Sequence, residues 1–332
     1  MKYKRNHYVP EFYLSKFSLI PAGKRKAQLW VYDKEEIAPH EQSPRDTAVI
    51  NDLYKIFTPD FPSNALELAF GDQENTISPI LTRWTKKGAV PTIDEANEVA
   101  YFLALLHLRN PKTASWYEAV AELVAVEKAK AFAQDSVQFD KFWETLMKEG
   151  SISSKLTKEK FREMTKNFDK HFVIKFDHQY ITLSPLKYAD DIFNELRKMH
   201  YCLCSAPDGW SFITSDSPVV ISFPKEGGLA FGGGFGHPKA QVRFPISPQV
   251  CLYLSRNFRN KTSKVNTDFV KDANRRMAIN AERFIFASFR SDGIEKLVKK
   301  HAFTRHQPRL DKDEMIENMI NRTKHFKPTS ST

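Results

Sequence analysis

The spacing of apolar residues changes its period near residue 200. From about residue 64 to 200 apolar residues recur at helical spacing, and the first such set is Leu66, Phe70, Ile77, Ile80, Leu81 and Trp84. After His200 the chain consists of short runs rich in β-branched and aromatic residues, separated by Pro, Gly and Asp. Side chains repeat every 3.6 residues on a helix face and every two on a strand face. The pattern therefore predicts a helical block over 64–200 followed by a sheet-rich part over 201–300.

Within the helical block the clearest start signal is a capping box. Thr92 is placed to cap a helix and Glu95 follows three residues later, ahead of the apolar run 99–106. This helix should end at Asn110-Pro111, because the residue before proline is disfavoured in helices. Further helical patterns cover 113–134, 138–149, 157–168 and 185–199.

The sheet-rich part contains five short runs with strand character, at 201–205, 210–214, 219–223, 241–246 and 250–254. We expect them to form one mostly antiparallel sheet. A helix over 265–279, a strand over 283–288 and a helix over 291–300 should complete the core. At the N-terminus, Pro10 favours a short helix after His7, and residues 28–33 form an alternating first strand.

These elements predict an α+β fold. A large helical block is inserted between the N-terminal strand and a mixed, mostly antiparallel C-terminal sheet. We expect one domain over 1–327 with a flexible tail at 328–332. An apolar stripe over 313–325 indicates an amphipathic helix that docks on its own core or on a second copy of the chain, which would make a homo-oligomer.

Composition indicates a folded protein outside the membrane. Of 332 residues, 41% are apolar and 13% aromatic, which suffices for a substantial core. We expect no export signal, and no window approaches the roughly 18 apolar residues of a membrane span. The three cysteines are too few for a disulfide framework. The sequence thus predicts a cytoplasmic protein with reduced, buried thiols.

Positive charge is concentrated near the chain ends. The net charge is +10, and residues 256–276 carry seven Lys and Arg against Asp268 and Asp272. Residues 1–26 carry seven against Glu11, and 290–332 carry ten against six. If these segments fold together, they form a basic surface suited to nucleic acid or another polyanion. The alternative is an ordinary solvated surface.

Several motifs spread over nearly the whole chain carry a family resemblance. They are 6–17 (Asn-His-Tyr-Val-Pro-Glu-Phe-Tyr-Leu-Ser-Lys-Phe), 51–54, Glu74 in 72–79, 109–111, 212–219, 244–248 and Asn274. With these motifs the chain resembles the large microbial family catalogued as domain of unknown function 4238. Ser217 departs from the family pattern, which usually has Asn there. The resemblance implies a single domain and carries no activity.

His7 and its neighbour Asn6 are the first candidate site residues. His7 would precede a helix N-terminus, a setting that favours anions and lowers the pKa of an imidazole. It could act as a general acid or base, with Asn6 binding substrate; the alternative is a capping or core histidine.

Asp216 is the second candidate, with Ser215 beside it. A carboxylate at a strand end can orient a histidine, take a proton or bind a divalent metal ion, and Glu74 could share these roles. Ser215 would contact substrate. The same Ser-Asp-Ser-Pro string also suits a tight turn in which Asp bonds its own backbone.

Arg109 should lie at the end of an apolar helix, where a guanidinium needs an anionic partner. Pairing with Glu74 or Asp216 would be structural, and holding an anionic substrate would be functional. Asn274, on a late helix, is a further candidate for substrate contact.

These residues support three hypotheses. The first is a nuclease or phosphoesterase-type hydrolase that uses His7, Asp216 and Glu74, with a divalent metal ion as possible cofactor. The second is a non-catalytic module that binds RNA or single-stranded DNA through the basic N- and C-terminal segments and exposed aromatic residues. The third is a hydrolase or transferase acting on a nucleotide-like anion.

Overall fold

The computed structural model describes residues 5–20, 26–36, 38–55, 64–153, 155–223 and 234–302. This part of the chain forms two compact units, one from residues up to Ala114 and from Thr182 onward, the other from Ser115–Ile181. The predicted α+β class is confirmed, with antiparallel-dominated sheets and a helical block between the N-terminal strands and the C-terminal sheet. The predicted helix at 313–325 and the tail lie outside the described residues.

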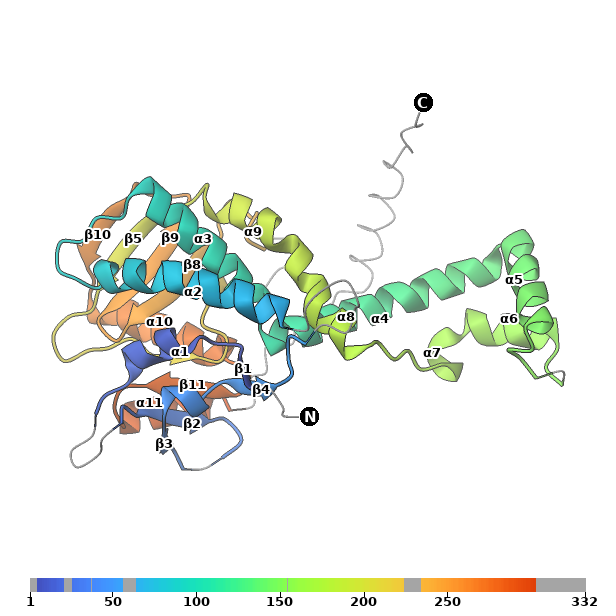
Figure 1. Ribbon diagram of the computed structural model, residues 1–332, viewed down its shortest axis with the longest axis horizontal. Coiled ribbons are helices and arrows are strands. Elements are labelled where there is room, and N and C mark those ends of the chain that lie inside the picture. Colours follow the sequence, from blue (N-terminus) through green and yellow to red (C-terminus); the bar gives the residue numbers. More distant parts are fainter. Residues whose placement is uncertain are drawn as a thin grey trace. The chain divides into compact units, whose positions relative to one another are not determined.

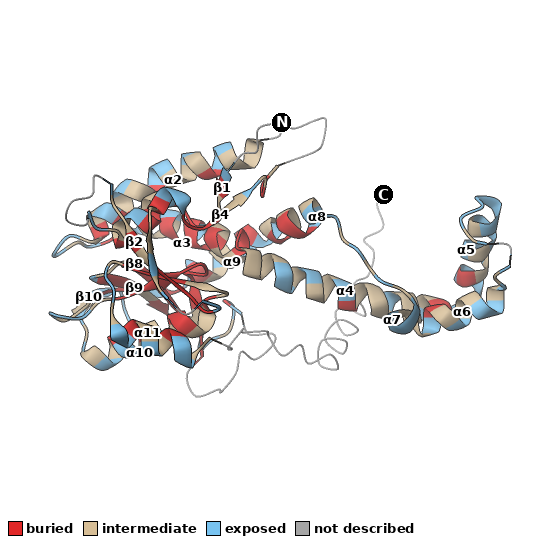
Figure 2. Ribbon diagram, turned by 90° about the horizontal axis from the view of Figure 1, so that it is seen from below, coloured by how far each residue is buried: buried red, intermediate tan, exposed pale blue. Residues whose placement is uncertain are grey.

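The first unit is centred on a five-stranded sheet of order β10-β5-β9-β8-β7. Its strands are β5 (His200–Ser205), β7 (Val220–Ser222), β8 (Gln241–Ser247), β9 (Val250–Ser255) and β10 (Lys261–Lys264). All neighbours are antiparallel except β10 and β5, which run parallel. Figure 2 shows that buried residues are concentrated on β8 and β9.

Helices cover both faces of this sheet, and the alternation of side chains along each strand assigns the layers. Helices α2 (Ala65–Trp84), α3 (Ile93–Leu108) and α9 (Ala189–Leu196) pack on one face, and α10 (Thr267–Asn280) packs on the other (Figure 1). Phe244 and Leu252 point into the first layer, whereas Cys251 and its neighbour Tyr253 point toward α10. Every second residue therefore contributes to the same core.

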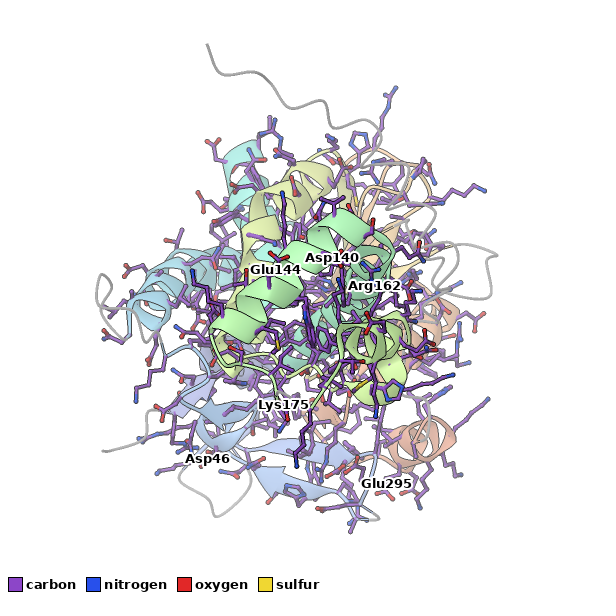
Figure 3. The ribbon with its side chains drawn as sticks, turned by 90° about the vertical axis from the view of Figure 1, so that its right-hand side faces the viewer. Asp46, Asp140, Glu144, Arg162, Lys175 and Glu295 are labelled. Carbon is purple, nitrogen blue, oxygen red and sulfur yellow. The ribbon has the colours of Figure 1, made fainter. Side chains whose placement is uncertain are left out.

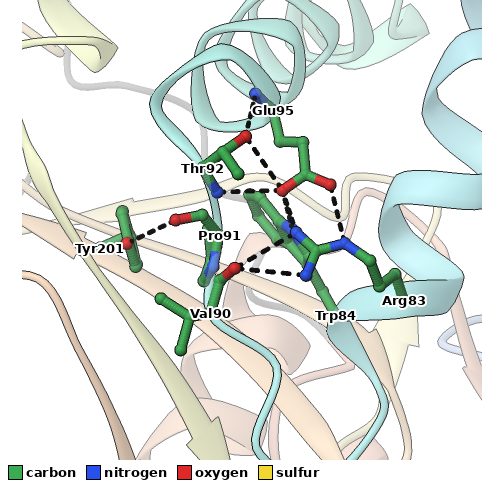
Figure 4. A network of polar contacts seen from close by, with 7 residues as sticks. All are labelled: Arg83, Trp84, Val90, Pro91, Thr92, Glu95 and Tyr201. Atoms are coloured by element: carbon green, nitrogen blue, oxygen red, sulfur yellow. Dashed lines mark hydrogen bonds and ion pairs between the residues drawn. The ribbon is translucent and has the colours of Figure 1, made fainter.

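The predicted start of α3 is confirmed in detail. The Thr92 hydroxyl caps the helix by accepting a hydrogen bond from the Glu95 main-chain amide, and the Glu95 carboxylate accepts one from the Thr92 main-chain amide (Figure 4). The same carboxylate pairs with Arg83 at the end of α2, so one acidic side chain joins both helices. Among the described residues, no helix combines the length and the apolar character needed to cross a membrane.

Two smaller sheets lie in the same unit. The four-stranded sheet has the order β3-β2-β11-β6 and is antiparallel throughout. Its strands are β2 (Leu29–Asp33), β3 (His40–Gln42), β6 (Thr214–Ser215) and β11 (Phe284–Ala287). Strands β1 (Arg5–His7) and β4 (Val49–Asn51) form a separate pair. The short α1 (Glu11–Leu14) follows β1, and α11 (Asp292–Lys300) packs with α10 on the four-stranded sheet.

The expectation of one C-terminal sheet is corrected by these pairings, because β6 joins β11 and not the strands around it in sequence. The strand predicted over 210–214 is reduced to Thr214–Ser215. The amide of Phe212 donates to the Pro248 carbonyl and that of Ile213 to the Asn274 side chain. These donors are used outside a strand ladder, which explains why the strand starts later.

The second unit is helical, as predicted for this region. It contains most of α4 (Pro111–Gln134), then α5 (Ser136–Lys148), α6 (Lys158–Lys166), α7 (Phe168–His171) and the start of α8 (His178–Leu183). Phe139 is fully buried, and its ring lies under the guanidinium of Arg162. Asp140 pairs with Lys158 and Arg162, both at 3.3 Å, and joins α5 to α6 (Figure 3).

Candidate functional site

The carboxylate of Asp216, just after β6, is held by main-chain donors. One oxygen accepts from the amide of Glu282 at 2.9 Å, and the other accepts from Arg283 and Phe284 at 2.7 and 2.8 Å. Asp216 is 3% exposed, and burial raises its pKa although the three amides partly oppose this. The side chain therefore anchors the turn after β6 to the start of β11. The turn interpretation expected a bond to the backbone of the same turn; the backbone that Asp216 bonds belongs instead to a segment more than 60 residues away.

Asn110 connects this turn to the junction between α3 and α4, within the helical block. The side-chain NH₂ group of Asn110 donates to the main-chain carbonyl of Asp216. Its side-chain oxygen accepts from the Ser217 hydroxyl at 3.2 Å. Asn280, at the end of α10, donates to the Ser217 carbonyl at 2.7 Å and accepts from Lys112 at 3.0 Å. Burial lowers the pKa of Lys112 to about 8. Two motifs far apart in sequence, 109–111 and 212–219, thus meet in one buried hydrogen-bond network.

Arg109 and Glu74 form an ion pair at 3.0 Å. The Arg109 side chain is 1% exposed and lies over the Phe70 ring, whereas the Glu74 side chain is 25% exposed. The Tyr54 hydroxyl donates to the Arg109 carbonyl at 3.2 Å. Of the two structural partners considered for Arg109, Glu74 is the one that it contacts.

His7 and Asn6 make separate contacts on β1. The Nε2 atom of His7 lies 3.1 Å from the carbonyl oxygen of Arg45. A carbonyl oxygen can only accept, so a hydrogen bond here requires the hydrogen on Nε2. Asn6 is buried and donates to Glu67 at 3.1 Å. Within the described part of the chain, neither Arg109 nor Asp216 lies within hydrogen-bonding distance of the His7 ring.

Ser215 and Asn274 are also bonded within the protein. The Ser215 hydroxyl contacts the Met277 sulfur at 3.1 Å and accepts from the Ser217 amide. The Asn274 amide donates to the Ser211 carbonyl at 2.9 Å and accepts from Ile213 at 3.1 Å. These two side chains position the segment leading into β6.

Tyr13 adds a further buried link between motifs. Its hydroxyl donates to the Pro245 carbonyl at 2.7 Å and lies 2.6 Å from the Thr214 hydroxyl. Pro245 cannot donate to a ladder and lies at an irregularity of β8, where its carbonyl is turned toward Tyr13. The N-terminal motif thus joins the motifs 212–219 and 244–248.

The candidate catalytic residues His7, Asp216 and Glu74 therefore make no direct contacts with one another among the described residues. Among the described residues, no group of three His, Cys, Asp or Glu side chains could hold a metal ion. Their catalytic and metal roles stay predictions. The hydrogen bonds of these residues instead connect the sequence motifs to one another, in a network that stabilises the fold.

A different set of side chains lies on the side formed by α10 and β10, where the lysines are open to solvent. Lys271 lies over the ring of Trp210 at 5.1 Å, and Lys261 lies over that of Phe258 at 5.6 Å. Trp210 is 37% exposed. The Phe258 ring stacks on Tyr253 at 5.3 Å, so these rings continue under α10.

Arginines continue this side of the molecule. The Arg243 guanidinium lies 5.0 Å from the Tyr253 ring centroid and 5.7 Å from that of Phe269. Arg275 and Arg276 lie on α10 and pair with Asp272. We call this set the basic–aromatic face; its members are Trp210, Arg243, Tyr253, Phe258, Lys261, Lys264, Phe269, Lys271, Arg275 and Arg276.

Sequence reasoning identified the positive charge of 256–276, including Arg275 and Arg276, and expected exposed aromatic residues in a binding module, but it did not identify Arg243 or the particular rings beside these cations. A signal was available, because Tyr253, Phe258 and Phe269 are interleaved with the basic residues. Arg243 stands between Val242 and Phe244, so strand alternation turns it away from the main core and toward α10. Of the basic segments at the two chain ends, 1–26 and 290–332, residues 5–20, 26 and 290–302 are described.

Comparison with known proteins identifies a family. The family model described as protein of unknown function (DUF4238) matches residues 5–291, and the chain belongs to this family. No curated protein and no solved structure matches the chain.

Proposed function

We propose that this DUF4238 protein binds single-stranded nucleic acid, RNA or DNA, through the basic–aromatic face. The observation that carries the proposal is the pairing of exposed cations with aromatic rings, Lys271 with Trp210 and Lys261 with Phe258. Proteins that bind single strands combine cations that follow the phosphates with rings on which bases stack. Both groups are present here on adjoining elements.

The charge distribution supports the same function. Lys261, Lys264, Lys271 and Arg275 are exposed, so their charges are available to phosphates. Only Asp268 and Asp272 oppose them within 256–276. Each phosphate contact on a single strand contributes a slope of about −0.7 to the plot of log affinity against log salt concentration. Four contacts give a slope of about −2.8, or an affinity loss of about 50-fold between 50 and 200 mM salt.

The test is fluorescence anisotropy with labelled single-stranded RNA and DNA of about 12 nucleotides, a length within the range of known sites. Trp210→Ala should weaken binding about 5- to 150-fold, the range for loss of one stacked base. The matched control is Trp116→Ala, because Trp116 has a similar exposure of 36% and lies in the second unit. Salt-independent binding, or equal effects of the two substitutions, would contradict the proposal.

Hydrolysis of nucleic acid is the second proposal, and one observation favours it. When His7 donates from Nε2 to the Arg45 carbonyl, its Nδ1 is the basic nitrogen, which is the state a general base requires. A nuclease assay on labelled RNA and single-stranded DNA, with Mg²⁺ and with EDTA, tests it. Loss of cleavage in His7→Ala with unchanged binding would support hydrolysis. Cleavage equal to wild type in that variant would exclude His7 from catalysis.

A further inference from the structure

Three arginines converge on one carboxylate in the basic–aromatic face. Asp272 contacts Arg275 at 2.8 Å, Arg276 at 2.7 Å and Arg243 at 3.4 Å. Two of these pairs are ordinary neighbours on α10 at spacings of three and four residues. The third is not local, because Arg243 comes from β8. The cluster thus holds a surplus of two positive charges.

Arg243 is held in a costly position. Its side chain is 8% exposed, and it donates to the Ser222 hydroxyl at 2.7 Å and to Gln241 at 3.3 Å. Its Nε atom is one of the buried side-chain nitrogens that lack a hydrogen-bond partner among the described residues. Burial and the nearby charge of Arg276 lower its pKa. A buried cation with an unused donor and a shared counter-ion is poorly explained by stability alone.

We infer that Arg243, Arg275 and Arg276 form a binding site for a terminal phosphate monoester, and that Asp272 occupies this site when no ligand is bound. The identification of the ligand as the end of a nucleic-acid strand rests on the proposed function. On this inference, the basic–aromatic face recognises the phosphorylated end of the strand.

The chemistry of the cluster favours a phosphate monoester over a phosphodiester. A guanidinium presents paired donors that match carboxylate and phosphate oxygens equally well, so a site that holds Asp272 also suits phosphate. At neutral pH a monoester carries a charge between about −1.5 and −2 and three acceptor oxygens. Displacement of Asp272 leaves three guanidinium charges in the site. A monoester neutralises these charges better than a diester within the strand, which carries a single negative charge. Asp272 is 33% exposed and Arg275 47%, so a ligand can reach the site.

The first test compares three oligonucleotides of one sequence, with a phosphate at the 5′ end, at the 3′ end or at neither end. Wild-type protein should bind one phosphorylated form about tenfold more tightly than the unphosphorylated form, as expected for several charge-assisted contacts. Arg276→Gln should abolish this preference. Lys264→Gln, which removes one positive charge from the same face but lies outside the cluster, should preserve it. Equal binding of all three oligonucleotides to wild type would overturn the inference.

Asp272→Asn provides the sharper test, because it removes the resident carboxylate. The ligand then need not displace exposed ion pairs, and affinity for the preferred phosphorylated oligonucleotide should rise about tenfold. Asp268→Asn is the matched control: it removes the same charge from the same helix, but Asp268 is 82% exposed and pairs only with Lys271 among the described residues. An equal gain in both variants would show a general charge effect and contradict the site.

Inorganic phosphate separates failure of this inference from failure of the proposed function. Phosphate should raise the thermal midpoint of wild-type protein more than that of Arg276→Gln, at constant ionic strength. If phosphate does so while no oligonucleotide binds, the site stands and nucleic-acid binding fails. If oligonucleotides bind but the midpoint shift is the same in both proteins and no end preference is seen, the binding function stands and this inference fails.

Discussion

Replacement of Asp216 by Asn tests whether this residue anchors the fold. The Asp216 carboxylate accepts three buried main-chain amides at 2.7 to 2.9 Å. An asparagine side chain offers one oxygen and one NH₂ group, so at least one amide must face a donor. We therefore expect a loss of stability although the two side chains have almost the same shape.

The magnitude follows from these contacts. One orphaned buried amide costs about 1–3 kcal/mol, and the remaining bonds lose the extra strength of an ionised acceptor, together about 1–2 kcal/mol. Relief of the buried charge, whose cost is evident in the raised pKa of Asp216, offsets part of this loss. The net decrease in the free energy of unfolding should be about 2–3 kcal/mol. With a denaturant slope of about 2–3 kcal/mol per molar, the urea midpoint should fall by about 1 M.

Urea denaturation followed by circular dichroism measures this shift. The control is Asp208→Asn, because Asp208 is exposed in a turn and its replacement should change stability by less than about 0.5 kcal/mol. A catalytic carboxylate predicts the reverse result, since replacing a strained charged group leaves stability equal or higher. If the midpoint of Asp216→Asn matches or exceeds that of wild type, the anchoring role is refuted.

Three further substitutions probe other parts of the network. Tyr13→Phe should lower the free energy of unfolding by about 2 kcal/mol, because the buried Pro245 carbonyl loses its donor, and chemical denaturation measures the change. Glu74→Gln should lower the free energy of unfolding by about 3 kcal/mol, because it leaves the Arg109 charge, 1% exposed, without its counter-ion. Arg109→Met should lower it by only about 2 kcal/mol, because the Glu74 side chain, 25% exposed, can turn to water. A lower urea midpoint for Arg109→Met than for Glu74→Gln would contradict this assignment. The pKa of Lys112, lowered to about 8, lies below its ordinary value of 10.5, so stability should rise with pH between these values, by up to about 1.4 kcal/mol per pH unit. Lys112→Met should lack that rise, and urea midpoints at pH 7.5 and 9.5 compare the two proteins; equal slopes would refute it.

Features that depend on neighbouring residues could be predicted from the sequence. The capping box of Thr92 and Glu95, the helices of the block and the α+β class follow from side-chain spacing and local hydrogen bonds. The motif residues could also be selected in advance, since a buried polar side chain demands a partner. For Arg109 the two structural partners considered included the correct one, Glu74.

Tertiary structure decided which distant segments satisfy each of these demands. The string around Asp216 is compatible with a catalytic carboxylate and with a turn, and only the approach of residues 282–284 shows that three amides bond to it. The separation of β6 from the five-stranded sheet likewise depends on β11, about 70 residues away in sequence. The convergence of Arg243 with Arg275 and Arg276 requires β8 to lie beside α10. Local periodicity specifies elements and faces, whereas partners are selected by packing, because a contact between distant residues forms only when the whole core closes around it.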